Sequence, residues 1–240
     1  MAIHLHVDPF NGIAGDMFLA ALIHVGVPTA VIQKQLAKLP IKEPFLLKVT
    51  PVCRLGIEGI DLKVDAVTSS VHRRYRDLLD LIDHLEISDR GQANTRRIIH
   101  ALAKAEAAVH GQSIDNVHFH EVGAIDSIVD LLGSAVALEW LDVQTVSCGP
   151  LPISRGFVQC AHGTLPVPAP ATAYLLKGVA TVGVDRTGEL VTPTGAALMV
   201  GLGAHFGPPP PMVVKAVGYG AGDREDPVVP NLLRLVLGEV

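Results

Sequence analysis

The sequence has few charged residues and no excess of positive charge. Charged side chains make up only 18% of its 240 residues, and the formal net charge is −5. The one basic cluster, residues 73–76, is soon offset by Asp77, Asp80 and Asp83. This composition argues against a nucleic-acid-binding protein, which needs a basic surface.

Cysteine is also scarce, and long hydrophobic runs are absent. Cys53, Cys148 and Cys160 are widely spaced with no CxxC pair. This excludes a disulfide framework and a zinc ribbon, and it indicates reduced thiols that are core or neutral residues. No apolar run approaches the roughly 20 residues that span a bilayer, and the N-terminus lacks the pattern of a secretory signal. We therefore expect a cytoplasmic protein without a membrane segment.

Apolar residues are plentiful, at 49% of the chain. A chain of this length can bury a full core, so we expect one compact unit, with possible lobes at residues 1–145 and 146–240. Because few charged residues remain to cover the surface, we expect part of it to be hidden in a homo-oligomer.

The hydrophobic pattern alternates between strand and helix periods, which predicts an α/β fold with mixed sheets and packed helices. Residues 207–211 predict a rigid polyproline connector. We expect strands at residues 3–8, 145–153, 179–184, 213–219 and 232–237, with two more within 45–67. We expect helices at residues 15–25, 28–38, 75–85, 89–110, 126–141, 168–177 and 192–206.

The segment from residue 118 to residue 127 concentrates four possible metal ligands or proton carriers. His118 and His120 alternate with apolar residues 117 and 119, so an extended backbone turns both imidazoles to one face. Glu121 and Asp126 follow through a turn into a helix. The pattern predicts a mixed nitrogen and oxygen site for a metal or for acid–base chemistry. Solvated strand histidines are the alternative.

The opening loop places two carboxylates around glycines. Asp8 ends a predicted strand, Gly12 and Gly15 follow, and Asp16 lies in the first turn of a helix. Glycines allow close approach of a ligand, and carboxylates suit a divalent cation that bridges an anion. Alternatively, Asp16 merely complements the helix dipole and the glycines make a tight turn.

Asp126 and Asp130 are four residues apart and share one helix face. Residues 127–130 match a capping box, which predicts that Asp130 closes the helix start. We therefore expect Asp126 to be the functional carboxylate of the two.

Two later loops carry further candidates for substrate binding. Arg155 could clamp a phosphate or carboxylate through two hydrogen bonds, and His162 lies in a turn-rich loop. Thr192, Thr194 and Gly195 begin a helix whose free amides could hold an anion. A surface arginine, a loop histidine and simple helix capping by the threonines are the alternatives.

Taken together, these blocks closely resemble the LarC family of nickel insertion proteins. The resemblance rests on residues 8–17, 117–126, 162–172 and 189–197, which occur in the family's order. It extends through residues 217–222 and 231–234 and so covers almost the whole chain.

The resemblance implies a cytosolic nickel chelatase of the lyase class. Family members insert Ni²⁺ into pyridinium-3,5-bisthiocarboxylic acid mononucleotide to form the nickel-pincer nucleotide of lactate racemase, using CTP with Mg²⁺ or Mn²⁺. The family's pattern maps onto Asp8, Gly12, Gly15, Asp16, His118, His120, Glu121, Asp126, His162, Thr192, Thr194 and Gly195.

Roles within that set are our inference. His118 and His120, with a carboxylate from Asp8, Glu121 or Asp126, are expected to hold nickel. Arg155 or the amides at residues 194–195 are expected to position the nucleotide phosphate. His118, Glu121 and Asp16 are the candidate acid–base groups.

The sequence departs from the family pattern in two places. Only His72 precedes Arg73, whereas many members carry a histidine-rich stretch there, so nickel storage by that loop is not expected. Family proteins also continue into a C-terminal CTP-binding domain, so this chain resembles the N-terminal part, with that domain or a separate subunit as its partner.

Two rival functions follow from the same residues. Asp8, Asp16 and Asp126 could form a magnesium cluster for phosphoryl transfer, with His118 as acid or base. Alternatively, the chain is a non-catalytic module that offers a nickel or substrate surface to a separate CTP-using subunit.

Overall fold

The computed structural model describes residues 1–66, 73–119, 123–160 and 162–240 and is built around a seven-stranded sheet. Its strand order is β11-β6-β1-β13-β12-β3-β2. β1 is parallel to β6 and antiparallel to β13, so the sheet is mixed and the predicted α/β class is confirmed. The strands are β1 (Ile3–Asp8), β2 (Phe45–Arg54), β3 (Ile57–Ala66), β6 (Val143–Cys148), β11 (His205–Phe206), β12 (Val213–Ala221) and β13 (Leu232–Glu239).

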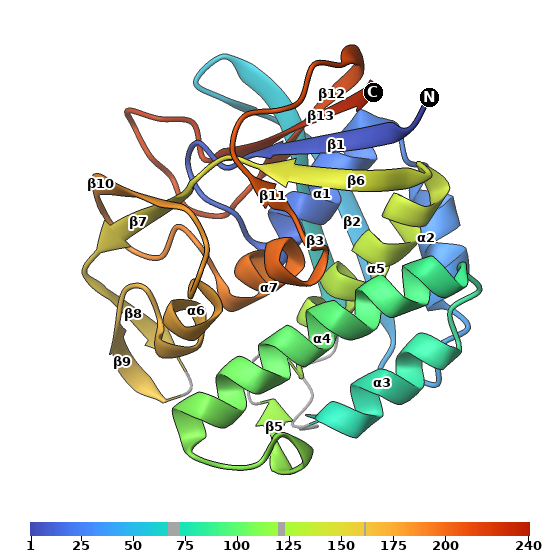
Figure 1. Cartoon of the computed structure of the whole chain (residues 1–240), viewed down its shortest axis with the longest axis vertical. Coiled ribbons are helices and arrows are strands. Elements are labelled where there is room, and N and C mark those ends of the chain that lie inside the picture. Colours follow the sequence, from blue (N-terminus) through green and yellow to red (C-terminus); the bar gives the residue numbers. More distant parts are fainter. Residues whose placement is uncertain (67–72, 120–122, 161) are drawn as a thin grey trace.

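The helices stack in layers on one side of this sheet (Figure 1). α1 (Gly15–Val25), α5 (Ile125–Trp140) and α7 (Pro193–Gly201) form the inner layer, and α2 (Thr29–Leu36) packs beside α5. α3 (Tyr75–Asp83) and α4 (Asp89–His110) lie outside them, and α6 (Pro170–Leu175) contacts α4 and α7. None of the helices in the described ranges is long and apolar enough to cross a membrane.

Close backbone contacts hold the inner layer to the sheet. A Cβ atom at Gly220 of β12 would lie 1.8 Å from the carbonyl oxygen of Met17, so α1 can approach only a residue without a side chain. α5 is buried in twelve of its sixteen residues, as its uniformly apolar sequence predicts. Gly133 of α5 packs against Leu19 of α1.

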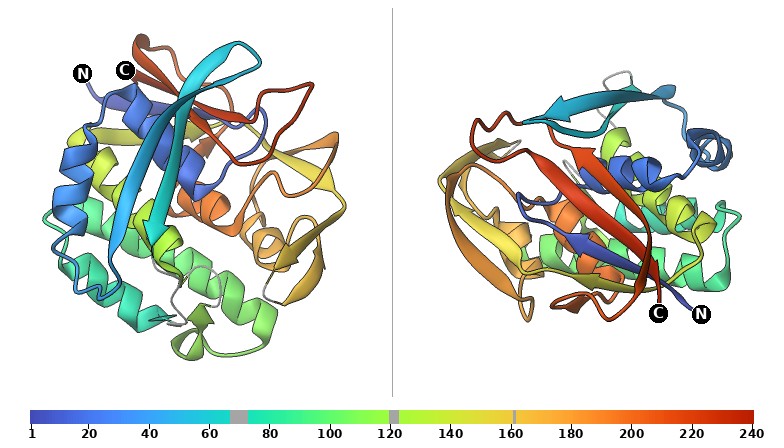
Figure 2. Two further views of the ribbon diagram at one scale, coloured as in Figure 1. Left: turned by 180° about the vertical axis from the view of Figure 1, so that it is seen from behind. Right: turned by 90° about the horizontal axis from the view of Figure 1, so that it is seen from above.

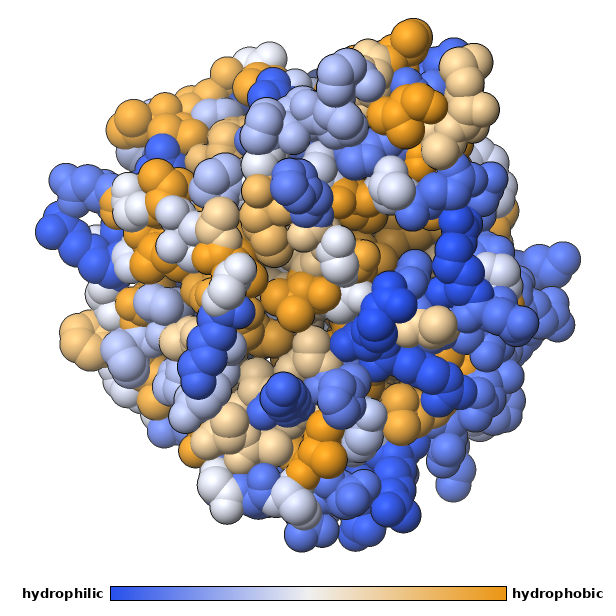
Figure 3. All heavy atoms as spheres, in the orientation of Figure 1, coloured by the Kyte–Doolittle hydropathy of each residue, from blue (hydrophilic) through white to orange (hydrophobic). Residues whose placement is uncertain are grey.

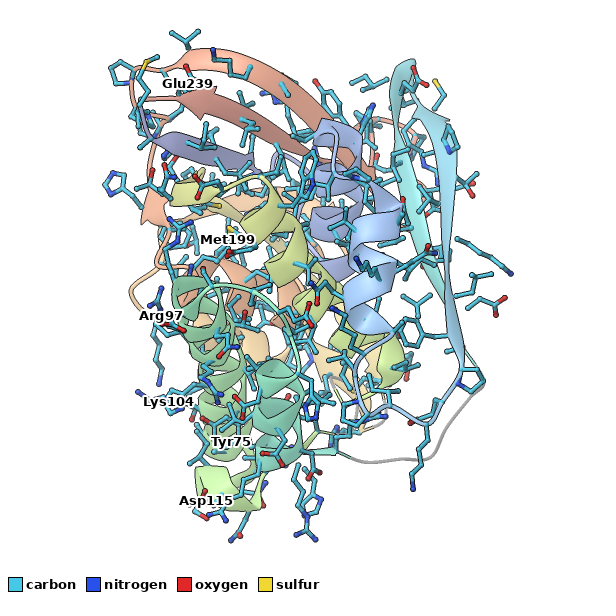
Figure 4. All side chains as sticks on the ribbon, turned by 90° about the vertical axis from the view of Figure 1, so that its right-hand side faces the viewer. Tyr75, Arg97, Lys104, Asp115, Met199 and Glu239 are labelled. Atoms are coloured by element: carbon cyan, nitrogen blue, oxygen red, sulfur yellow. The ribbon has the colours of Figure 1, made fainter. Side chains whose placement is uncertain are left out.

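Charged side chains concentrate on the outer helices. In Figure 3, hydrophilic residues gather over the region that α3 and α4 occupy in Figure 1. Figure 4 shows Arg97 and Lys104 pointing outward from α4, whereas Met199 of α7 lies in the interior. These helices are amphipathic, as their sequence spacing predicts.

Smaller sheets lie beside and below the main one (Figures 1 and 2). β7 (Leu151–Arg155) pairs with β10 (Thr181–Thr187), and β8 (Phe157–Cys160) forms a hairpin with β9 (Gly163–Pro166). β4 (Arg73–Arg74) pairs with β5 (His118–Phe119), which follows the 3₁₀ turn η1 (Ile114–Asn116). The large sheet takes strands from both segments 1–145 and 146–240.

Two element predictions were wrong. The strand expected at 145–153 is divided into β6 and β7, because Pro150 has no amide N–H for a continuous ladder. The helix expected at 192–206 ends at Gly201, and Gly203 with φ +66° turns the chain into β11. The β8–β9 hairpin was not predicted.

The outer face of β1 is polar but buried. Leu5 and Val7 face the helices, while His4 and His6 face the other way and are still only 4% and 9% exposed. Ser147 joins the two imidazoles: its Oγ lies 2.8 Å from His4 Nε2 and 2.8 Å from His6 Nδ1. The connector from β11 to β12 crosses these strands in Figure 1.

Candidate functional site

The histidine segment begins on β5 as the sequence predicts. Val117 and Phe119 are buried, and His118 between them is half-buried on the opposite side of the strand. His120 and Glu121, like His72, lie outside the described residues. A shared face for the two imidazoles therefore stays a prediction.

A buried arginine ties together the two sides of this segment. The Arg73 guanidinium donates to the carbonyl oxygen of Gly123 at 2.9 Å and forms an ion pair with Glu43 at 2.6 Å. A Cβ atom at Gly123 would lie 2.5 Å from the carbonyl oxygen of Phe119. Phe119 and Gly123, which flank His120 and Glu121 in the sequence, are thus in close contact. Arg73 has a structural role that its place in the basic cluster did not indicate.

The opening loop packs against the loop before α7. Ile13 donates its backbone N–H to Leu190 at 2.8 Å and accepts from Thr192 at 3.1 Å. A Cβ atom at Gly12 would lie 2.1 Å from the Leu190 carbonyl oxygen, and one at Gly195 would lie 2.3 Å from that of Ile13. Packing alone therefore requires both glycines, and their predicted role in substrate binding stays a prediction.

The hydroxyls at the start of α7 are already engaged. Thr192 Oγ1 accepts from the Gly195 backbone N–H at 3.2 Å and caps the helix. Thr194 Oγ1 lies 2.9 Å from Thr192 Oγ1 and accepts from the Gly15 N–H at 3.2 Å. The Thr192 bond confirms that this threonine caps α7, as the alternative interpretation of the sequence expected. The Thr194 bond joins α7 to the start of α1. An anion at this site stays a prediction.

The expected capping box at residues 127–130 is wrong. α5 begins at Ile125, with Ala124 at its N-cap, so Ser127 lies inside the first turn and cannot cap it. Asp130 is instead buried beside α1, where a Cβ atom at Gly15 would lie 2.9 Å from its Oδ2. Within the described part of the chain, Asp130 Oδ1 has no hydrogen-bond partner.

Asp130 and Asp16 lie close enough near the start of α1 for their charges to interact. Burial raises the pKa of Asp130 well above its ordinary value, and the charges of Asp16 and Asp126 raise it further against the effect of Lys63. Burial also raises the pKa of Asp16, whose Oδ1 accepts from the Met17 N–H at 2.8 Å. A buried carboxyl group with a raised pKa is a candidate for acid–base chemistry, so Asp130 joins Asp16 as a candidate.

The other predicted carboxylates are held elsewhere. Asp8 accepts from Arg234 Nε at 3.0 Å on the outer face of β1. The exposed Asp126 accepts from the Ser127 N–H at 2.7 Å. In the ranges that the structure describes, no three histidine, cysteine or acidic side chains are grouped to hold a metal, so Asp8, Asp16 and Asp126 do not form the magnesium cluster of the rival hypothesis.

A cavity of about 500 Å³ lies between the end of α4, the β8–β9 hairpin and the starts of α6 and α7. His162 lines it, together with Glu106, His110, Cys160 and Glu189. The rings of His110 and His162 are 5.1 Å apart between centroids, and His110 Nε2 lies 3.4 Å from Glu106. The cavity therefore brings imidazole, carboxylate and thiol groups to one opening, but among the described residues no three of them are grouped closely enough to hold a metal ion.

Sequence reasoning missed Glu106 and His110. Both lie on α4, which its pattern identified only as an ordinary amphipathic helix. Their spacing of four residues at the helix end was the one available signal, and it is common in surface helices.

Arg155 lies away from this cavity at the end of β7. Its side chain is exposed, and Nη2 lies 2.5 Å from the exposed Asp185. Its predicted role as a phosphate clamp stays a prediction.

Comparison with known proteins places the chain in one family. Residues 5–240 match the family described as nickel insertion protein. Proteins named "Putative nickel insertion protein" from Geotalea daltonii and from Geobacter sp. strain M21 are 46% and 48% identical to it, over 98% of this chain and 60% and 61% of their own lengths.

A relative from Geobacillus kaustophilus is named pyridinium-3,5-bisthiocarboxylic acid mononucleotide nickel insertion protein. It is 41% identical over 98% of this chain and 59% of its own length. No solved structure matches the chain. The chain thus spans about 60% of the length of the relatives it matches. These matches confirm the resemblance identified from the sequence: the chain belongs to the nickel insertion protein family.

Proposed function

We propose that this chain is the nickel- and substrate-binding part of an enzyme that inserts nickel into pyridinium-3,5-bisthiocarboxylic acid mononucleotide. The observation that carries the proposal is the match of 98% of the chain, at 41% identity, to the Geobacillus kaustophilus relative that bears this name. The cavity beside His110 and His162 supports it, because its volume of about 500 Å³ offers room for a small ligand.

Nickel is a substrate in this reaction, so its ligands must release it. We assign it to His118 and His120 with a carboxylate from Glu121 or Asp126, because Asp8 is held by Arg234 on the outer face of β1. Imidazole and carboxylate groups bind Ni²⁺ without the retention expected of a thiolate cage. His118 or Glu121 would accept the proton lost when the pyridinium ring carbon bonds to nickel, and Asp16 is a further acid–base candidate.

Turnover is proposed to need more than this chain. We expect CTP with Mg²⁺ or Mn²⁺, bound by a C-terminal domain or a separate subunit. Assembly into a homo-oligomer and a cytosolic location are parts of the same proposal.

Reconstitution tests the function. The chain is incubated with the pyridinium mononucleotide, Ni²⁺, CTP and Mg²⁺, with and without the C-terminal domain of a relative, and the product is measured by mass spectrometry. We expect a nickel-containing product when both parts are present. Absence of product in every combination would contradict the proposal.

Calorimetry tests the nickel ligands. Replacing His118 and His120 by alanine should weaken Ni²⁺ binding by at least about tenfold, because two of the proposed ligands are lost. His84→Ala is the matched control, since His84 is exposed just after α3. Unchanged affinity in the double variant would reject the assignment.

A further inference from the structure

Two arginines, Arg186 and Arg224, donate hydrogen bonds to the same side-chain amide oxygen, that of Asn11. Arg186 of β10 donates through Nη1 to Asn11 Oδ1, and Arg224 donates through Nη2 to the same atom at 3.4 Å. Arg224 Nη1 also donates to the carbonyl oxygen of Thr187 at 3.2 Å. Both guanidinium groups are therefore fixed by neutral acceptors.

The shared acceptor is itself held in place. Asn11 is 1% exposed, and its Nδ2 donates to the carbonyl oxygens of Val229 at 3.2 Å and Pro230 at 3.1 Å. These bonds orient the amide so that Oδ1 faces the two arginines. The arrangement joins the opening loop, β10 and the loop between β12 and β13.

The positive charge of the pair is poorly neutralised. Among the described residues, no carboxylate lies within 4 Å of Arg186 or Arg224 in an ion pair. Asp226 is the opposing charge nearby, and its Oδ1 accepts from the backbone N–H groups of Val228 and Val229 at 2.9 and 3.0 Å. Burial lowers the pKa of Arg224, and Arg186 lowers it further against the opposing effect of Asp226. Two half-buried like charges are costly unless an anion joins them.

We propose that Arg186 and Arg224 form a receptor for a phosphate monoester. Each guanidinium has five N–H donors in a planar fork, and the bonds described above leave several of them for an oxyanion. This inference rests on the proposed function in one respect: the 5′-phosphate of the mononucleotide is the group that would bind. Thr187 lies two residues before Glu189, so one loop connects this receptor with the cavity.

Calorimetry with inorganic phosphate tests the receptor without nickel or CTP. Arg186→Gln and Arg224→Gln should each weaken phosphate binding by at least about tenfold, because charge-assisted hydrogen bonds are lost. Arg76→Gln is the control for loss of one positive charge, since the Arg76 side chain is exposed on α3 and pairs with the exposed Asp115. Equal affinities in all variants, or a loss confined to Arg155→Gln, would overturn the proposal.

Asp226→Asn keeps the test independent of any folding defect in the arginine variants. Asparagine retains an oxygen acceptor for the Val228 and Val229 N–H groups but removes the competing charge. We expect this variant to bind phosphate several-fold more tightly, and unchanged or weaker binding would contradict the receptor. Acetate that bound as tightly as phosphate would also contradict it. Phosphate binding retained without nickel insertion would count against the proposed function alone, whereas insertion without phosphate binding would count against the receptor alone.

Discussion

Asp130 places a carboxyl group in the interior between α5 and the first turn of α1. Because burial and then the charge of Asp16 raise its pKa, the folded protein favours the protonated form more than the unfolded chain does. The stability that the protonated Asp130 side chain contributes is therefore complete below the pKa of about 3.9 that aspartate has in the unfolded chain. It is lost as the pH rises through the higher pKa of Asp130 in the folded protein.

Asp130→Asn should remove this pH dependence. We expect the variant to be more stable than the wild type at pH 7.5 by about 1–3 kcal/mol, with the difference vanishing near pH 4. Urea unfolding at the two pH values measures it, with the exposed Asp115→Asn as control. A variant that is less stable than the wild type at pH 7.5 but not near pH 4 would contradict this account, because it would show that the folded protein favours the charged carboxylate.

Ser147 is the shared hydrogen-bond partner of two buried imidazoles. Ser147→Ala should cost about 1–3 kcal/mol in the free energy of unfolding, because His4 and His6 would each lose a partner in a buried site. Ser113→Ala, at an exposed position, is the control. Equal stabilities of the two variants in a denaturant titration would argue that the bridge contributes nothing.

Residue-scale predictions succeeded where local alternation decides the outcome. Val117, His118 and Phe119 have the expected burial because strand geometry alone sets it. The environment of Asp130 could not be predicted in the same way, because it depends on α1, which is more than a hundred residues away in the chain.

At the scale of elements, the contact between the opening loop and α7 depends on glycine. Gly195→Ala should destabilise the protein by about 1–3 kcal/mol, because the new Cβ would lie 2.3 Å from the Ile13 carbonyl oxygen. Gly183→Ala is the matched control, since no atom lies within 4 Å of its added Cβ. Thermal unfolding compares them, and a Gly195→Ala protein as stable as the control would refute this account of the contact.

Elements with strong end signals were predicted accurately. α4 spans Asp89–His110 as expected, because the Ser88 side chain caps its start and Gly111, with φ +61°, ends it. The β8–β9 hairpin was missed because both of its strands are short and largely exposed, so no buried face imposes a period of two.

At the scale of the whole molecule, distant segments meet in the main sheet and around the cavity. β1 lies between β6 and β13, so the first strand pairs with the last. The cavity joins α4 to the β8–β9 hairpin, and the arginine pair joins two loops and β10. Such groupings depend on topology, which is why the sequence carries little sign of the roles of His110, Arg186 and Arg224.

We propose above that this chain binds nickel for transfer to a mononucleotide. Crystals soaked with Ni²⁺ and measured at the nickel absorption edge would show where the metal binds. We predict an anomalous peak within bonding distance of His118, completed by His120 and a carboxylate. A peak at His110 and His162 alone would contradict the ligand assignment, and the absence of any nickel peak on the chain would contradict the claim itself.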